Sequence, residues 1–441
     1  MKQKIEKDSF FKSVGVILSG TVFAQAKTLF VAPFITRLYS PSEFGLFAVY
    51  ISVMAIIVIL GSLRYEMAIL LPRKRRDAYS ILILCFLIAM PISILVFAVL
   101  SYLSFSSLQI SAYFLFLPFA FFATVGCQIL TKWQLREKKF HRIAVSRVAQ
   151  SSLTAAVQLS FFKGGPLGLI AAHFLGQVIQ FIILKKNAVF ARDVFRENKK
   201  RLEEVAFRYR RFPLFDTSYA VFFAAGQQSP TVLLGLMFGP SAAGLYALSE
   251  RVLSAPLNVI GGAVGSVFFS HVSDSTSVLE RNQMILNVYT KMFYLSLMPA
   301  VIIFLFGEEV FGYVFGEAWI EAGKIATYLV PFFVSQFVVS PLITIFAVLE
   351  EQKAAAFLQG AIFFARIIVL ILGSMFWSLE TVVVMFSVVS VIGAILQLCF
   401  IFWRCKIPPL LVLFNHIKIA LVFLLLLVFF EFTNYWIFGN V

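Results

Sequence analysis

The chain has 441 residues, of which 60% are hydrophobic and only 13% are charged, and its net charge is +15. Ordinary soluble domains are about half apolar and about a quarter charged, so this composition excludes a soluble globular domain. The four cysteines lie in or beside apolar runs without C-x-x-C spacing, which favours packed free thiols over a metal site or a disulfide.

Apolar runs of membrane-spanning length recur along the whole chain, separated by short polar breaks. A helix needs about 20 apolar residues to cross the hydrocarbon core, whereas a barrel strand alternates apolar and polar residues. Stretches such as 81–100 and 420–430 are continuously apolar, so the spans are predicted to be helices. The predicted spans are 13–37, 43–63, 79–103, 110–131, 143–162, 165–184, 214–237, 243–268, 289–312, 324–349, 354–376 and 380–403, with a further span at about 411–437.

The first span imitates a signal peptide, because four lysines precede it and it contains Ala24-Gln25-Ala26. Its apolar stretch continues to Ile35, so we expect an uncleaved first span. Of the 37 lysines and arginines, 30 lie at the breaks on one side of the predicted spans. By the positive-inside rule, this asymmetry places the N-terminus in the cytoplasm. It also explains the net charge by topology, without a nucleic-acid partner.

A long basic connection divides the twelve main spans into two groups of six. The predicted parts are an N-terminal lobe at 1–184, a charged and partly helical cytoplasmic linker at 185–213, a C-terminal lobe at 214–403 and a thirteenth helix within 404–441. A repeat supports this division, because Pro41–Ala48 and Pro240–Ala247 share the pattern P-S-x-x-G-L-aromatic-A at equivalent topological places. Repeated halves around a central site are common in transporters. The predicted fold is therefore an all-α polytopic membrane protein with two pseudo-symmetric lobes.

Three cations inside predicted spans are the main candidate site residues: Lys27, Arg251 and Arg366. Charged groups are costly in lipid, so each is a functional candidate. One hypothesis is a cationic lining for a water-filled cavity, since arginine and lysine bind phosphate and pyrophosphate groups. The other is structural pairing of Arg251 with Glu250 or Asp216, and of Arg366 with a carboxylate on a neighbouring helix.

A second group of polar residues lies in or at the ends of the spans. It comprises Gln25, Arg37, Arg64, Glu66, Asp216 and Glu250. Arginines near a membrane interface commonly extend their head groups toward water, which is the alternative for Arg37 and Arg64. His173, inside the sixth span, is interpreted as a packed, hydrogen-bonded histidine.

No catalytic constellation is apparent in the sequence. It contains no glycine-rich phosphate loop and no H-E-x-x-H motif, so no enzyme activity, cofactor or metal is predicted. Transport by this chain alone would then depend on a gradient, the membrane potential or removal of the product.

Two motifs in the first half and one in the second resemble a known family. They are Ile35–Ala48, then Arg64-Tyr65-Glu66-Met67-Ala68-Ile69 with Leu71-Pro72, and Arg211-Phe212-Pro213 followed by Gly239–Leu248 and Arg251. These segments resemble the polysaccharide transporters, the Wzx-like flippases of the MOP superfamily.

The resemblance implies two six-helix lobes around a cavity that opens alternately to each side of the bacterial inner membrane. The implied substrate is an undecaprenyl-pyrophosphate-linked oligosaccharide, moved from the cytoplasmic to the periplasmic leaflet for O-antigen, capsule or exopolysaccharide assembly. The implied partners are a polysaccharide polymerase and a chain-length regulator. Lys27 and Arg251 lie in spans comparable to those that hold cationic residues in the family, whereas Arg366 has no motif to anchor it.

Three other functions are compatible with many spans. A lipid II flippase and a drug or cation antiporter belong to the same superfamily, and the usual cavity acids of the antiporter are not apparent in the first six spans. A membrane-embedded polymerase or glycosyltransferase would need a sizeable periplasmic loop, and outer connections such as 104–109 and 239–242 are too short for one.

Overall fold

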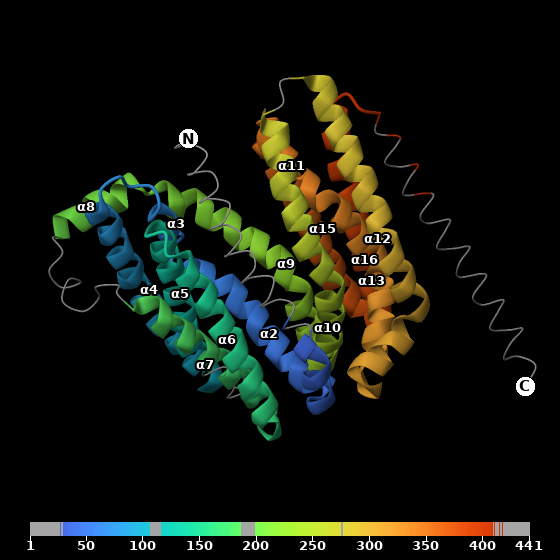
Figure 1. The fold of residues 1–441 in the computed structure, drawn as a ribbon. Coiled ribbons are helices and arrows are strands. Elements are labelled where there is room, and N and C mark those ends of the chain that lie inside the picture. Colours follow the sequence, from blue (N-terminus) through green and yellow to red (C-terminus); the bar gives the residue numbers. More distant parts are fainter. Residues whose placement is uncertain are drawn as a thin grey trace, which may run out of the picture. The chain divides into compact units, whose positions relative to one another are not determined.

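The computed structural model describes Lys27, residues 30–105, 116–186, 199–274 and 277–408, and the single residues Leu410, Phe414 and Ile417. Regular structure in these residues is entirely helical, with no strand among them, and this confirms the all-α class (Figure 1). Two compact units can be distinguished, one ending at Val232 and the other beginning at Leu233.

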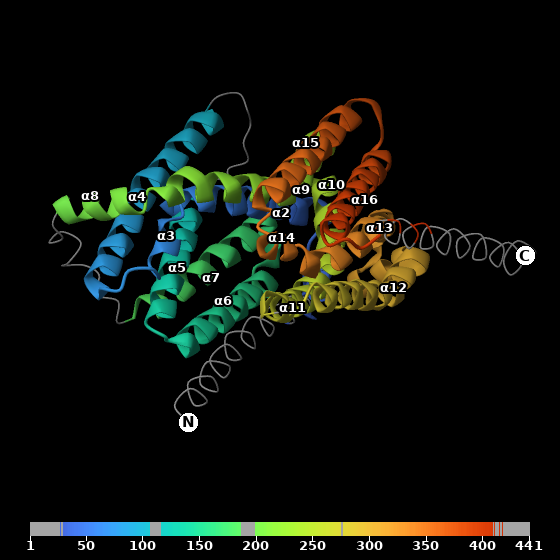
Figure 2. The same cartoon turned by 90° about the horizontal axis from the view of Figure 1, so that it is seen from above.

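The first unit is a bundle of antiparallel and crossing helices in which α6 and α7 run side by side (Figures 1 and 2). His173 on α7 is held there by Tyr50, at 3.3 Å, and by Gln177, at 3.2 Å, as expected for a packed histidine. The elements are α2 (Pro41–Ile57), η1 (Val58–Ser62), α3 (Tyr65–Ala68), α4 (Arg75–Phe105), α5 (Leu117–Arg136), α6 (Phe140–Ser160), η3 (Phe162–Gly164), α7 (Pro166–Lys185), α8 (Lys199–Arg208), η4 (Phe212–Asp216) and the first part of α9 (Thr217–Phe238).

The second unit is organised around α13, which packs against α10, α12 and α16. Its elements are α10 (Pro240–Pro256), η5 (Leu257–Gly261), α11 (Gly262–Asp274), α12 (Val278–Phe315), η6 (Glu317–Trp319), α13 (Ile320–Leu342), α14 (Ile345–Val348), α15 (Gln352–Phe376) and α16 (Leu379–Arg404). In the apolar segment that includes α13, 72% of the residues are buried, whereas in the apolar segment of α15 only 11% are buried. Large apolar side chains of α15 such as Phe364 and Ile368 are exposed, as expected for a helix surface that faces lipid.

The two copies of the repeated octapeptide each begin a helix. Pro41 opens α2 and Pro240 opens α10, where a missing backbone N–H costs nothing. At α2 the Ser40 side chain accepts from the Glu43 amide, and the Glu43 carboxylate accepts from the Ser40 amide at 2.8 Å. Gly239, with φ 91°, adopts at the start of α10 a backbone conformation that favours glycine. The equivalent placement supports an internal duplication.

Eight helical stretches among the described residues are long and apolar enough to cross a membrane. Helices occur at every predicted span from 43–63 to 380–403. The helices α5 and α6 do not belong to these eight because polar side chains interrupt their apolar runs, and α10, with 17 residues, is too short by itself. Most of the first predicted span and the segment 411–437 lie outside the described residues, apart from a few single positions.

The compact units meet at Val232 and Leu233, within α9. The linker predicted from charge, 185–213, lies about twenty residues earlier and includes α8. The first helix of the predicted C-terminal lobe therefore begins in the first compact unit. The division into lobes of six spans each stays a prediction.

Candidate functional site

A sharp turn between η1 and α3 positions the first group of charged side chains. Leu63 and Arg64 join the two helices, and both have left-handed backbone angles, φ 47° and φ 62°. This conformation costs a residue other than glycine about 1 kcal/mol or more. Two such residues in succession indicate that the surrounding contacts hold the turn in place.

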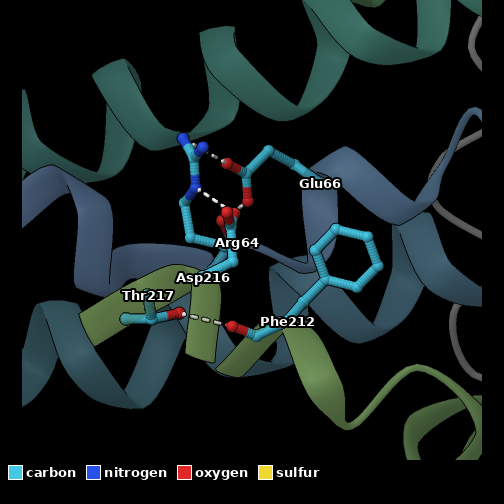
Figure 3. Close-up of polar contacts among 6 residues, drawn as sticks. Arg64, Glu66, Phe212, Asp216 and Thr217 are labelled. Carbon is cyan, nitrogen blue, oxygen red and sulfur yellow. Dashed lines mark hydrogen bonds and ion pairs between the residues drawn. The ribbon is translucent and has the colours of Figure 1, made fainter. Parts of the chain in front are cut away.

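The turn directs Arg64 toward two carboxylates (Figure 3). Its Nε donates to Asp216 Oδ2 at 2.8 Å, and its Nη1 lies 3.9 Å from Glu66 Oε1. Glu66 is only 3% exposed and also accepts a hydrogen bond from the Ser62 hydroxyl. The structure thus brings together three residues that the sequence had indicated separately, and Arg64 pairs with carboxylates instead of extending toward water.

Asp216 reaches Arg64 from a widened helical turn at the start of α9. Residues Phe212–Asp216 form a π-helical turn that contains Pro213. The Thr217 hydroxyl donates to the Phe212 carbonyl oxygen at 3.2 Å across this turn (Figure 3). Single π turns occur frequently at functional sites. The ion cluster, defined as Arg64, Glu66 and Asp216, therefore joins the end of one predicted span to the start of another.

Two further cations belong to these surroundings, and sequence reasoning assigned them only to membrane orientation. Lys132 on α5 interacts electrostatically with Glu66, with Arg64 and with Arg147 on α6. Both side chains are half-buried. For Arg147 the available signal was its position inside the predicted span 143–162. Lys132 follows the predicted span 110–131, and only the structure, in which α5 continues to Arg136, places it within a helix.

Lys27 is held on α6, because its Nζ donates to the Ser152 hydroxyl at 2.6 Å. Its side chain is half-buried. A lysine ammonium has three donors, and one of them is used in this bond. Arg37 is exposed, and Gln25 lies outside the described residues.

In the second unit the candidate residues gather around α10. Glu250 and Arg251 are half-buried neighbours in the chain and interact electrostatically. The pairing hypothesis for Arg251 thus has support from Glu250, whereas Asp216 is engaged by Arg64. The ring of Tyr246, one helical turn before Glu250, packs edge-on against Phe386 with 6.2 Å between the ring centres, and Arg366 lies over the same Phe386 ring. The structure therefore connects Arg366 to α10, which the sequence had not indicated.

Arg366 lies between two aromatic rings and not beside an acid. Its guanidinium carbon is 5.0 Å from the centre of the Phe332 ring and 5.5 Å from that of Phe386. No carboxylate is within ion-pair distance of it in the part of the chain that the structure describes. Its Nε is buried and has no hydrogen-bond partner among those residues. The alternative hypothesis, structural pairing with a neighbouring carboxylate, therefore has no support among the described residues.

In each unit, considered by itself, the site residues include more cations than acids. The described residues hold no group of three side chains suited to a metal ion. Charged and polar side chains within membrane helices commonly face a water-filled path or the bundle interior. The helices α5, α6 and α10 carry such side chains, namely Lys132, Ser152 and Arg251 respectively. Chemically, the excess of cations in each unit can attract an anion.

The fold defines the class of the protein. It is similar to an inward-facing multidrug resistance MATE family transporter of the MOP superfamily, with TM-score 0.68 and 14% identity over 88% of this chain and 94% of that one. It is also similar to a MATE protein in complex with MaL6, with TM-score 0.58 and 15% identity over 89% and 95% of the two chains. A MOP superfamily transporter from Pyrococcus furiosus, described by the reverse polarity of its binding pocket, matches with TM-score 0.58 and 14% identity over 89% and 94%. The fold is thus a multi-span transporter fold.

The family follows from the sequence itself. The profile of the family described as polysaccharide biosynthesis protein matches residues 34–324, about two thirds of the chain. The chain belongs to this polysaccharide biosynthesis protein family, which confirms the resemblance carried by the motifs between Ile35 and Arg251. A comparison with curated proteins finds no match.

Proposed function

We propose that the protein is a flippase that moves undecaprenyl-pyrophosphate-linked oligosaccharide units across the membrane by alternating access. Transfer from the cytoplasmic to the periplasmic leaflet of the bacterial inner membrane would supply O-antigen, capsule or exopolysaccharide assembly. The membership of the polysaccharide biosynthesis family and the transporter fold support this role. A polysaccharide polymerase and a chain-length regulator are the expected partners, and the N-terminus is expected in the cytoplasm.

The observation that carries the proposal is the presence of cations within the helices of both units. Lys27 is anchored on α6, Arg251 lies within α10, and Arg366 has a buried Nε with no partner among the described residues. An isolated ion loses several kcal/mol or more when it leaves water, so a pyrophosphate with sugars needs a polar path. Dispersed cations within each unit would support such a polar path and would still let the cargo leave.

A drug exporter is the alternative that shares the fold, since one of the similar structures is a multidrug resistance transporter. The cations Lys27, Arg251 and Arg366 would each repel a cationic drug. The cations therefore favour an anionic cargo, including the pyrophosphate of lipid II as a second flippase substrate.

Replacing Lys27 or Arg251 with alanine is expected to abolish surface polysaccharide while leaving the amount of protein in the membrane unchanged. Each change removes a cation without introducing bulk, so binding of the pyrophosphate suffers more than folding. The measurement compares surface glycan and accumulated lipid-linked oligosaccharide in a deletion strain complemented with each variant. Lys163→Ala is the matched control, because Lys163 is an exposed cation on η3. Normal glycan in both Lys27→Ala and Arg251→Ala would refute the proposal.

A further inference from the structure

A basic pocket separate from the candidate site lies in the first unit, between the start of α4 and α8. Its volume is about 320 Å³, and its lining includes four basic side chains, Arg76, Lys200, Arg201 and Arg208, and two acidic ones, Asp77 and Glu204. In Figure 1 α8 lies beside the first turns of α4, and the two helices are in contact. The sequence analysis assigns the four basic residues only to membrane orientation, and none of the six belongs to the proposed transport path.

The charges of the pocket favour an anion after internal pairing. Arg201 donates to Asp77 at 2.8 Å, and both side chains are largely shielded, so this pair is a fixed part of the wall. The four basic and two acidic side chains of the lining give the pocket a net charge of +2. The α4 helix also begins here at Arg75, and the free amides of a helix start attract negative charge.

The position of the pocket indicates the source of that anion. The apolar stretch of α4 that is long enough to cross a membrane begins at Arg75, so Arg76 and Asp77 are expected where hydrocarbon gives way to head groups. On α8, Val205 is buried, and the Ala206 carbonyl accepts a hydrogen bond from Tyr65 at 2.9 Å. Burial, and secondarily Cys85, raises the pKa of Tyr65, so its hydroxyl keeps the proton that it donates.

An exposed aromatic side chain completes the interfacial character of α8. Phe207 is 66% exposed, and the Arg210 guanidinium carbon lies 4.1 Å from the centre of its ring. Basic and aromatic side chains combined on one short helix are typical of segments that lie on anionic membranes. A soluble phosphate has no apolar part that could contact Phe207, whereas a lipid carries acyl chains beside its phosphate.

We propose that the pocket between α4 and α8 binds the phosphate head group of an anionic membrane phospholipid. Arg76, Lys200 and Arg208 would contact the phosphate, and the Arg201–Asp77 pair would keep the two helices together around it. The bound lipid would fix α8 against the bundle. This inference does not depend on the proposed transport function.

The test measures the thermal unfolding midpoint of the full-length protein purified in detergent. Native mass spectrometry of the same protein measures the amount of lipid that is bound. The ligands are phosphatidylglycerol, phosphatidylcholine, inorganic phosphate and inorganic pyrophosphate. Phosphatidylglycerol is expected to raise the midpoint by several degrees, since ligands that bind only the folded state stabilise it. With Arg76→Gln and Arg208→Gln combined, about tenfold more phosphatidylglycerol should be needed for the same rise in the unfolding midpoint. The matched control is Arg73→Gln with Lys74→Gln, which removes the same charge from exposed residues outside the pocket.

The control pair should respond to phosphatidylglycerol as the unaltered protein does. An equal loss in both double variants would mean diffuse attraction and would overturn the proposal. Equal stabilisation by inorganic phosphate or pyrophosphate would also overturn it, because the lipid would then add nothing. Arg208→Gln alone, at the end of α8, provides a milder variant should the double variant fold poorly, and it is expected to weaken the lipid effect in the same direction.

Discussion

Replacing Gly323 with alanine is expected to destabilise the second unit severely. A Cβ at this position would lie 2.2 Å from the Gly307 carbonyl oxygen and 2.8 Å from the Glu308 Cα. Both are backbone atoms, so no side-chain rotation relieves the clash and α12 must move away from α13. Overpacking of this kind costs about 1–3 kcal/mol and occasionally more, and we expect the upper end or beyond. Small residues at such crossings let membrane helices approach closely.

The measurement is the thermal unfolding midpoint of purified protein in detergent, where a fall of roughly 5–10 °C is expected. Gly360→Ala is the matched control, because Gly360 also lies within a helix of the second unit and nothing is within 4 Å of its Cβ position. Its midpoint should be unchanged or slightly higher, since alanine favours the helix. Similar midpoints for the two variants would contradict the close crossing of α12 and α13.

Replacing Arg64 with alanine is expected to have the second large effect, on stability and on transport together. Glu66 is 3% exposed, so its carboxylate would stay buried without a cation directly beside it. Breaking a fully buried pair costs about 3–5 kcal/mol, and we expect about 2–3 kcal/mol because Arg64 and Asp216 are partly exposed. Asp216→Asn should cost less, since Asp216 is the more exposed acid.

Two companion variants separate charge from backbone geometry. Arg64→Ala combined with Glu66→Gln should recover part of the lost stability, because the buried group is then neutral. Arg64→Gly should be about 1 kcal/mol more stable than Arg64→Ala, because the left-handed turn favours glycine. Unfolding midpoints and surface glycan are measured for each variant. If the double variant were as unstable as the sum of its two changes, the ion cluster would not be the cause of the loss.

The spans could be predicted because they depend on composition over about 20 neighbouring residues. The helix starts at Pro41 and Pro240 could also be predicted, because proline favours the first position of a helix, and both helices begin there. The site could be predicted only as a set of unusual residues. The sequence indicates Lys27 as a cation inside a predicted span, but its bond to Ser152, 125 residues away, has no sequence signal.

Arg366 illustrates the same limit. Its position halfway along an apolar helix marked it as a candidate, while two interpretations of its partner stayed open. The structure replaces the expected carboxylate with the rings of Phe332 and Phe386, which come from α13 and α16. Phenylalanines are so frequent in this chain, with 52 in total, that no pattern distinguishes these two.

Local physics thus determined the all-helical, multi-span character of the protein, since lipid leaves every backbone group to be satisfied within its own helix. Tertiary structure alone decided which charges meet. The turn at Arg64 and the π-helical turn before Thr217 bring together side chains 152 positions apart, and the crossing of α12 and α13 depends on two glycines. Such contacts depend on how helices pack, and packing is a property of the whole bundle that no stretch of sequence contains.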